Sequence, residues 1–302
     1  MYYKVYILLF IALLSVSTSP IVARIIDAEG PAIAFWRMSI AAFVLWLYSI
    51  FDTTIKFQDK KNYKRTIYAG ILLGLHFALF FTAIDFTSIA HATFLGTLAP
   101  FFILIIEIVV LKRKFSKSTL IGLGSALLGA IIISFKNFDV ATSSTAGNLM
   151  AIACSICIAL SFLFADKVRK KESTLIYTRT LYLSAAITLV PITLFIAYYN
   201  NPNSIGDYLL NYSLEDYYGL IFLGIVPTIL GHNSIYYAVK YVPPSIASAF
   251  PLGEPVIATI FAYFLGLYGF TKFSGETIGS EIYLGGTLTI IGLLLITLNK
   301  NK

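Results

Sequence analysis

The sequence predicts an all-α integral membrane protein in which ten transmembrane helices form two inverted five-helix repeats. Hydrophobic residues make up 58% of the 302 residues and charged residues only 12%, a composition outside the range of soluble globular domains. The apolar segments are long enough to cross a hydrocarbon core as helices. The ten predicted spans are residues 4–23, 31–51, 66–85, 91–111, 118–135, 146–165, 174–199, 216–239, 246–267 and 282–298.

The repeats are predicted at residues 4–135 and 146–298. Three residues of the first copy have an identical residue 155 positions later, in an alignment without gaps. The pairs are Ala83 and Ala238, Ala92 and Ala247, and Pro100 and Pro255. An arginine with similar neighbours recurs 142 residues later: Phe35-Trp36-Arg37 as Tyr177-Thr178-Arg179. Because each copy has an odd number of spans, the two copies must lie in opposite orientations. Inverted repeats that meet near the bilayer midplane are the architecture of secondary transporters, so the sequence predicts a carrier.

Most of the 22 lysines and arginines fall on one side of a ten-span topology, in the connections 52–65, 112–117 and 166–173 and near both ends. Since positively charged connections stay in the cytoplasm, both termini are predicted to be cytoplasmic in a multi-pass protein of the plasma or inner membrane. Membrane orientation therefore explains the net charge of +7, and no nucleic-acid partner is expected. The first apolar segment resembles a signal peptide, but it lacks a convincing cleavage site and is interpreted as the first span.

Two arginines lie inside predicted spans, Arg37 after Trp36 in the second span and Arg179 in the seventh. Charged groups in the hydrocarbon region are costly and often mark a transport pathway. In one interpretation each arginine reaches the interface, or pairs locally and fixes its helix. In the other, one or both face a central cavity and attract an anionic group of a solute.

The ninth span contains Glu254 between Pro251 and Pro255. Two prolines four residues apart free backbone carbonyls, and such breaks near the midplane are tolerated where the helix lines a cavity. Glu254 is predicted either to bind a cation or proton, or to cap free amides and pair with an arginine. Its repeat counterpart is Ala99, beside the predicted hinge at Pro100, so any role of this carboxylate is confined to one half.

Two histidines, His76 and His232, fall near the middle of the third and eighth spans, and Pro227 predicts a kink in the eighth. A midplane histidine relays protons or serves as a hydrogen-bonded structural residue, and the sequence leaves both interpretations open. The residues after His232 are the most polar and aromatic of the second half: Asn233, Tyr236 and Tyr237. This helix is the best candidate to face a solute.

Sequence motifs for other functions are absent. There is no Gly-rich phosphate-binding loop ending in Lys-Ser/Thr, and neither a G-x-S-x-G nor an H-E-x-x-H pattern occurs. Cys154 and Cys157 lie mid-helix among small residues and are interpreted as packing residues rather than a redox pair. No enzyme activity, cofactor or metal is predicted. A membrane-embedded enzyme or a non-transporting receptor is the rival interpretation, but neither requires two opposed copies.

Several motifs together resemble the EamA-type branch of the drug/metabolite transporter superfamily over nearly the whole chain. They are Phe35-Trp36-Arg37, the alanine-rich entries to the fourth and ninth spans, Pro100, and Leu252-Gly253-Glu254-Pro255-Val256. The turn Leu111-Lys112-Arg113 departs from the family pattern, which has a glutamate where this chain has Arg113. Whatever that glutamate contributes in relatives is missing here or supplied by another residue.

The resemblance implies a ten-helix carrier with a cavity between its halves and a small solute that is often exported. Efflux of a metabolite or amino acid by alternating access is the leading prediction, and an uptake permease of the same fold is the alternative. The partners expected are the small solute and the lipid bilayer, with a coupled proton or counter-substrate left open. The sequence does not exclude a homo-oligomer.

Overall fold

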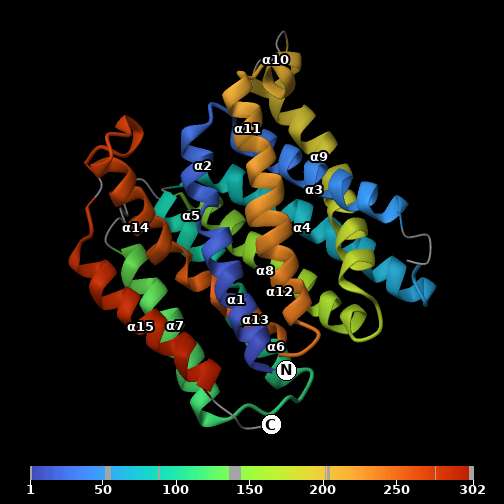
Figure 1. The fold of residues 1–302 in the computed structure, drawn as a ribbon, viewed down its shortest axis with the longest axis vertical. Helices are drawn as coiled ribbons and strands as arrows, with labels where there is room; N and C mark the ends of the chain where they lie inside the picture. Colours follow the sequence, from blue (N-terminus) through green and yellow to red (C-terminus); the bar gives the residue numbers. More distant parts are fainter. Residues whose placement is uncertain are drawn as a thin grey trace.

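The computed structural model describes residues 2–51, 56–87, 89–135, 144–200, 202, 205–275 and 277–298, and every regular element in these ranges is a helix (Figure 1). The first half contains α1 (Tyr2–Val16), α2 (Ser19–Ile25), α3 (Gly30–Ile50), α4 (Lys60–Phe86), α5 (Ile89–Gly96), α6 (Ala99–Val109) and α7 (Lys117–Phe135). The second half contains α8 (Thr145–Arg169), α9 (Thr174–Asn200), α10 (Ile205–Leu210), α11 (Leu214–Leu223), the π-helix η2 (Gly224–His232), α12 (Asn233–Ala238), α13 (Pro244–Ala249), the 3-10 helices η3 (Phe250–Gly253) and η4 (Thr271–Phe273), α14 (Glu254–Leu267) and α15 (Ser280–Leu298). The predicted all-α class is confirmed.

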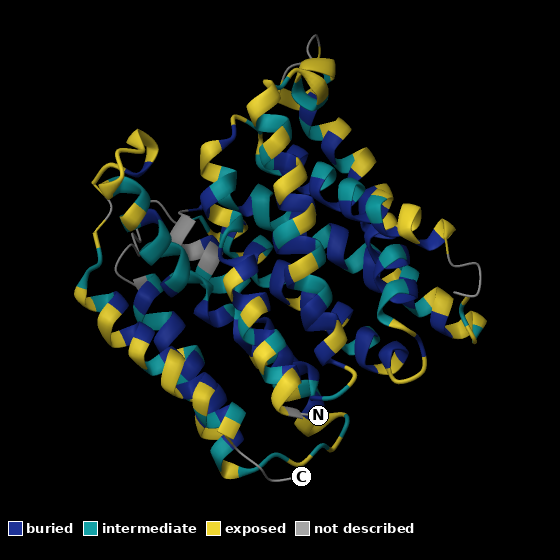
Figure 2. Ribbon diagram, in the orientation of Figure 1, coloured by how far each residue is buried: buried dark blue, intermediate teal, exposed yellow. Residues whose placement is uncertain are grey.

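Within the described ranges, nine helical segments are long and apolar enough to cross a membrane. The predicted fourth span is not among them, because it consists of α5 and α6 with an apolar helical stretch of only Phe94–Val109. The count of ten crossings therefore remains a prediction. Large apolar side chains point outward from the long helices, as the exposed positions in Figure 2 illustrate; Phe43, Ile187 and Leu284 are each at least 60% exposed. Such surfaces suit contact with lipid rather than water.

The helices of the two halves pair with one another in the pattern that a duplication requires. Helix α3 packs on its repeat counterpart α9, and α7 packs on its counterpart α15. Helix α4 packs on α8, and the reciprocal pairing places α1 against η2 and α12. The main interhelical contacts thus join one half to the other (Figure 1).

Glycines allow the close approach of α7 and α15. A Cβ atom on Gly129 would lie 2.3 Å from the carbonyl oxygen of Gly285, and one on Gly292 would lie 2.5 Å from that of Gly122. Without side chains at these positions the two backbones touch, and packing drives helix association in a membrane.

The fourth and ninth predicted spans break at equivalent places. Helix α6 begins at Ala99 with Pro100 in its first turn, and α14 begins at Glu254 with Pro255 in its first turn. Proline suits these positions because the first turn of a helix leaves its N–H groups without intrahelical partners. Pro251 lies in η3 and Pro227 in the π-helix η2, so the second half contains two additional irregular segments.

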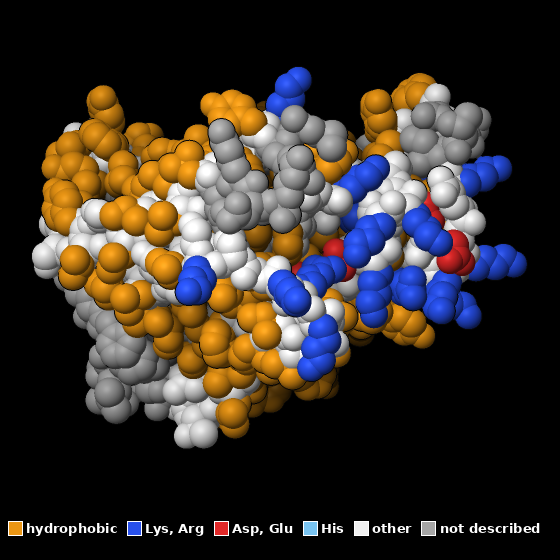
Figure 3. Space-filling model, turned by 90° about the horizontal axis from the view of Figure 1, so that it is seen from below, with side chains coloured by type: hydrophobic (Ala, Val, Ile, Leu, Met, Phe, Trp, Pro, Cys, Tyr) orange, Lys and Arg blue, Asp and Glu red, His pale blue; other side chains and the backbone are white. Residues whose placement is uncertain are grey.

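Basic side chains gather on one end of the molecule, shown in Figure 3. The start of α1, the end of α15 and the α6–α7 connection lie at this end, and α10 lies at the other (Figure 1). We call the first end the basic face and the second the α10 end. Arg169, counted from the sequence among the loop cations, is instead only 1% exposed, and its guanidinium binds the Glu172 carbonyl and the Thr174 hydroxyl.

Candidate functional site

Arg37 on α3 lies inside the bundle, 6% exposed, and connects the two halves. Its Nε donates to Thr228 Oγ1 at 2.9 Å, and its Nη1 donates to Ser19 Oγ at 3.0 Å. The guanidinium also lies 5.2 Å from the ring centroid of Phe77. The π-helix η2 carries Thr228 to this position. Because these partners are neutral, they bind the cation without neutralising its charge.

Glu254 supplies the opposite charge from the first residue of α14. It lies within electrostatic reach of Arg37, but at a greater distance than an ion pair. Among the described residues its carboxylate has no hydrogen-bond partner, although the side chain is enclosed by the helices and only partly accessible. A partly accessible carboxylate inside the bundle is available in this state to a cation, a proton or a polar solute group.

Both predicted histidines join this charged pair. His76 Nδ1 lies 3.1 Å from the backbone oxygen of Cys154, and its other ring nitrogen makes no hydrogen bond to the residues that the structure describes. His232 ends the π-helix η2 and interacts electrostatically with Arg37 and His76. We refer to Arg37, Glu254, His76 and His232 as the central cluster, which draws on α3, α14, α4 and η2.

Tyr182 on α9, which was not singled out from the sequence, extends the central cluster. Its hydroxyl donates to Asn233 Oδ1 at 3.0 Å and lies 3.3 Å from the Thr228 carbonyl oxygen. Tyr182 follows Arg179 by three residues, and a polar aromatic residue inside an apolar span was the signal that could have identified it. Asn233 thus lies next to the cluster, as predicted for the polar stretch after His232.

Four predicted site residues lie outside the central cluster. Tyr236 on α12 packs against Tyr177 and Phe162, and the other three are Trp36, Arg179 and Tyr237. Trp36 donates from Nε1 to the Leu209 carbonyl at 2.8 Å and ties α3 to α10. The Arg179 guanidinium lies 4.5 Å from the ring centroid of Trp46, a residue 40% exposed on the outer surface. Tyr237 is 39% exposed and packs near Tyr241 instead of pointing toward the cluster. These three therefore do not contact the central cluster.

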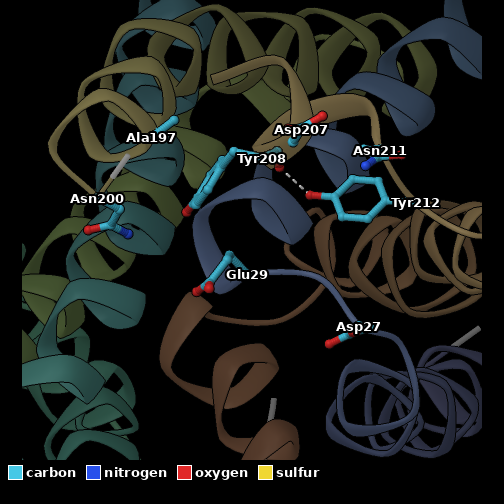
Figure 4. Close-up of a pocket in the computed structure, with 8 residues that line it drawn as sticks. All are labelled: Asp27, Glu29, Ala197, Asn200, Asp207, Tyr208, Asn211 and Tyr212. Carbon is cyan, nitrogen blue, oxygen red and sulfur yellow. Dashed lines mark hydrogen bonds between the residues drawn. The ribbon is translucent and has the colours of Figure 1, made fainter. Parts of the chain in front are cut away.

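Two open pockets lie at the α10 end, away from the central cluster. The larger has a volume of about 320 Å³ and is drawn in Figure 4; its lining residues are Asp27, Glu29, Ala197, Asn200, Asp207, Tyr208, Asn211 and Tyr212. The second, of about 90 Å³, shares Glu29, Asn200 and Tyr208 and continues to Phe81. Phe81 is one helical turn from Phe77, which lies under Arg37. We call these two adjoining pockets the vestibule; no residue of the central cluster lines either of them.

The vestibule is acidic and rich in hydrogen-bonding groups. Burial, reinforced by the nearby carboxylates of Glu29 and Asp216, raises the pKa of Tyr212 to about 12. Its hydroxyl donates to the Tyr208 carbonyl and therefore remains a donor over the physiological pH range. Chemically the pocket suits polar or cationic groups, but the central cluster is the stronger candidate for recognition because its charges are enclosed.

Ion pairs connect the two halves at the opposite end. Arg113 binds the carboxylates of Glu107 and Asp166, and Asp166 also lies 3.4 Å from the Lys170 ammonium group. Glu107 is fully buried, and its second oxygen accepts from the Ser245 N–H at 3.3 Å. Because Glu107 and Arg113 belong to the first half and Asp166 and Ser245 to the second, this network, which we call the latch, joins the halves at the basic face.

Lys112 explains how Arg113 reaches the latch. Its φ of 53° is left-handed, as at many helix C-termini, and it turns the chain back so that Arg113 N donates to the Glu107 carbonyl oxygen at 2.8 Å. The arginine that departs from the family pattern thus has a defined role in this chain, as the cation of the latch.

Comparison with known proteins gives the family. A model of the EamA-like transporter family matches residues 3–135 and again residues 145–298. The chain belongs to the EamA-like transporter family. It is 25% identical over 275 residues to the uncharacterized transporter YyaM of Bacillus subtilis, covering 89% of this chain and 87% of YyaM. It is 24% identical to the uncharacterized transporter YdfC of the same organism, covering 89% and 82%.

More distant comparisons agree. An uncharacterized transporter of Archaeoglobus fulgidus is 25% identical over 231 residues, covering 76% of this chain and 77% of the relative. A crystal structure of a protein with 15% identity superposes with a TM-score of 0.75 over 99% of this chain and 98% of that one, which shows a common fold. The predicted resemblance to the EamA family is confirmed, and so is the predicted class, a multi-pass membrane transporter. Membership of a transporter family points to transport of a small solute rather than to catalysis.

Proposed function

We propose that this EamA-like transporter is a secondary carrier that exports a small organic solute, a metabolite or amino acid, by alternating access. The observation that carries the proposal is the central cluster, where Arg37 of the first half and Glu254 of the second lie inside the helix bundle without forming an ion pair with each other. Unneutralised charges in that environment are costly, and their retention favours a solute that completes them. A zwitterionic solute would present an anionic group to Arg37 and a cationic group to Glu254.

The two ends of the molecule support an alternating mechanism. In this proposal the vestibule at the α10 end is the open side of the path, and the ion pairs of the latch close the basic face. With both termini in the cytoplasm, as the basic connections favour, this conformation is open toward the outside. Opening of the latch and closure of the vestibule would give the opposite conformation. In this scheme Glu254 is the group that exchanges a coupled proton or cation, or that binds a counter-substrate.

The proposal is tested by a panel of amino acids and related metabolites in proteoliposomes, with and without an imposed pH gradient. Glu254→Gln, which keeps the shape of the side chain, is expected to lower flux on the order of a hundredfold, since a lost charge contact of about 3 kcal/mol corresponds to that factor. The purified variant is expected to remain folded. Glu215→Gln, at an exposed carboxylate on α11, is the control and should leave flux unchanged. Wild-type flux in Glu254→Gln would reject a role for this carboxylate in transport.

The repeated arginines give a second, internally matched prediction. Arg37→Ala is expected to abolish flux because it removes the cation of the central cluster, whereas Arg179→Ala is expected to retain most of it because Arg179 stacks on Trp46 at the surface. Thermal stability and monodispersity of both purified variants are measured beside flux. Equal loss of flux in the two variants would contradict the proposed role of Arg37 in the solute path. It would indicate instead that both arginines stabilise the fold.

A further inference from the structure

Tyr177 on α9 and Tyr236 on α12 are completely buried, and neither hydroxyl makes a hydrogen bond of ordinary geometry among the described residues. The Ser161 hydroxyl lies near both, but it donates its own hydrogen to the Ala69 carbonyl at 2.9 Å. The two tyrosine rings lie 5.4 Å apart at 65°, and the Tyr236 ring also packs 5.2 Å from Phe162. Phenylalanine would make the same ring contacts without burying an unsatisfied hydroxyl, which is unfavourable. The conformation described here thus leaves both hydroxyls without a well-formed hydrogen bond.

The internal repeat relates this pair to two residues of the first half. At the repeat spacings of 142 and 155 residues, Tyr177 corresponds to Phe35 and Tyr236 corresponds to Phe81. Phe81 lines the inner part of the vestibule, and both phenylalanines are only partly buried. Phe81 therefore adjoins the vestibule, whereas its counterpart Tyr236 is fully buried.

Arg169 and the latch seal the tyrosine pair from the basic face. Arg169 Nε donates to the Tyr236 carbonyl at 3.1 Å, and Asp166, three residues before it on α8, is held by Arg113. Tyr177 and Tyr236 thus lie between the central cluster and the closed end, as Phe81 lies between the cluster and the open end.

We propose that Tyr177 and Tyr236 line the solute path on the basic-face side and hydrogen-bond polar groups of the solute when that side opens. This inference rests on the proposed carrier function and deepens it. When the carrier changes to the conformation that is open at the basic face, the two aromatic sites exchange environments. The tyrosine hydroxyls then become accessible to the solute, and Phe81 becomes buried. Since one side of the path then has phenol donors and the other phenyl rings, a polar solute binds more tightly from the basic face.

The first experiment measures accessibility and needs no known solute. Single cysteines replace Tyr236 or Phe81 in a Cys154→Ser, Cys157→Ala background, with the latch intact or opened by Arg113→Gln. A soluble maleimide is expected to label Tyr236→Cys at least about tenfold faster, and Phe81→Cys more slowly, when the latch is opened. Unchanged labelling of Tyr236→Cys in protein whose Phe81→Cys labelling does slow would overturn the proposal.

The second experiment uses Tyr177→Phe and Tyr236→Phe, which preserve the packing. Each is expected to raise the half-saturating solute concentration at the basic face about tenfold, with little change at the α10 end and no loss of thermal stability, since only a hydroxyl without a well-formed hydrogen bond is removed. Phe81→Tyr is the reciprocal variant and should tighten binding from the α10 end. Unchanged saturation in both phenylalanine variants, or lower stability with uniformly reduced flux, would show a structural role instead.

The two experiments separate this inference from the function on which it rests. If wild-type protein moves no solute of the panel while the labelling of positions 81 and 236 still changes in opposite directions, the proposed export is rejected. The proposed exposure of Tyr236 on opening of the latch is then still supported. If wild-type protein transports a solute and neither labelling nor saturation responds as described, the carrier stands and the tyrosine pair is excluded from its path.

Discussion

Replacing Arg113 with glutamine is expected to destabilise the closed basic face by about 3 to 5 kcal/mol, the effect of removing one partner from a buried ion pair. Arg113 is the cation shared by Glu107, which is fully buried, and Asp166, which is 7% exposed. Without it, two carboxylates remain close together in a region of low dielectric constant. Either the latch opens and water hydrates these two carboxylates, or their burial without a cation lowers the stability of the fold. Thermal unfolding of the purified protein measures the loss.

The same network contains a matched control. Lys170 also contacts Asp166, but its side chain is 58% exposed and its nitrogen lies 3.4 Å from the carboxylate. Exposed pairs of this kind contribute about 0 to 1 kcal/mol, so Lys170→Ala should unfold within about one degree or two of the wild type. Similar melting temperatures for Lys170→Ala and Arg113→Gln would contradict the view that the latch holds the basic face closed.

The latch also illustrates what the sequence could not predict. Arg113 was recognised as a departure from the family pattern, and Glu107 lies near the end of the predicted span 91–111. Their partners Asp166 and Ser245, however, lie 53 and 138 residues farther along the chain. Local patterns contain no information about which helix ends meet. The same is true of Arg37, whose hydrogen-bond partner Thr228 is 191 residues away.

The fold was more predictable because its causes are local. Long apolar segments and an internal repeat are visible in the sequence, and the helix starts at Ala99 and Glu254 coincide with repeated prolines. The rotation of each helix was harder to predict. In a span that is apolar on every side, no polar stripe distinguishes the lipid face from the interior, so Arg179 and Tyr237 could not be separated from Arg37 and His232 by composition.

Replacing Gly129 with leucine is expected to prevent the packing of α7 on α15. A Cβ atom there would lie 2.3 Å from the Gly285 carbonyl oxygen and 2.6 Å from the Thr289 nitrogen, both backbone atoms that cannot turn aside. The helices must separate, which also lengthens the 2.8 Å hydrogen bond from Ser125 Oγ to the Leu288 carbonyl. Overpacking of this kind costs about 3 kcal/mol or more, and we expect a low yield of folded protein with a reduced melting temperature.

Gly124, on the same helix, provides the control because a Cβ atom there would contact nothing within 4 Å. Gly124→Leu adds the same side chain on an exposed face of α7 and is expected to retain wild-type yield and melting temperature. The pair separates steric exclusion from the general effect of losing a helical glycine, since both substitutions raise helix propensity equally. Equal stability of the two variants would mean that α7 and α15 are not held in backbone contact, and that packing of small residues does not fix this helix pair.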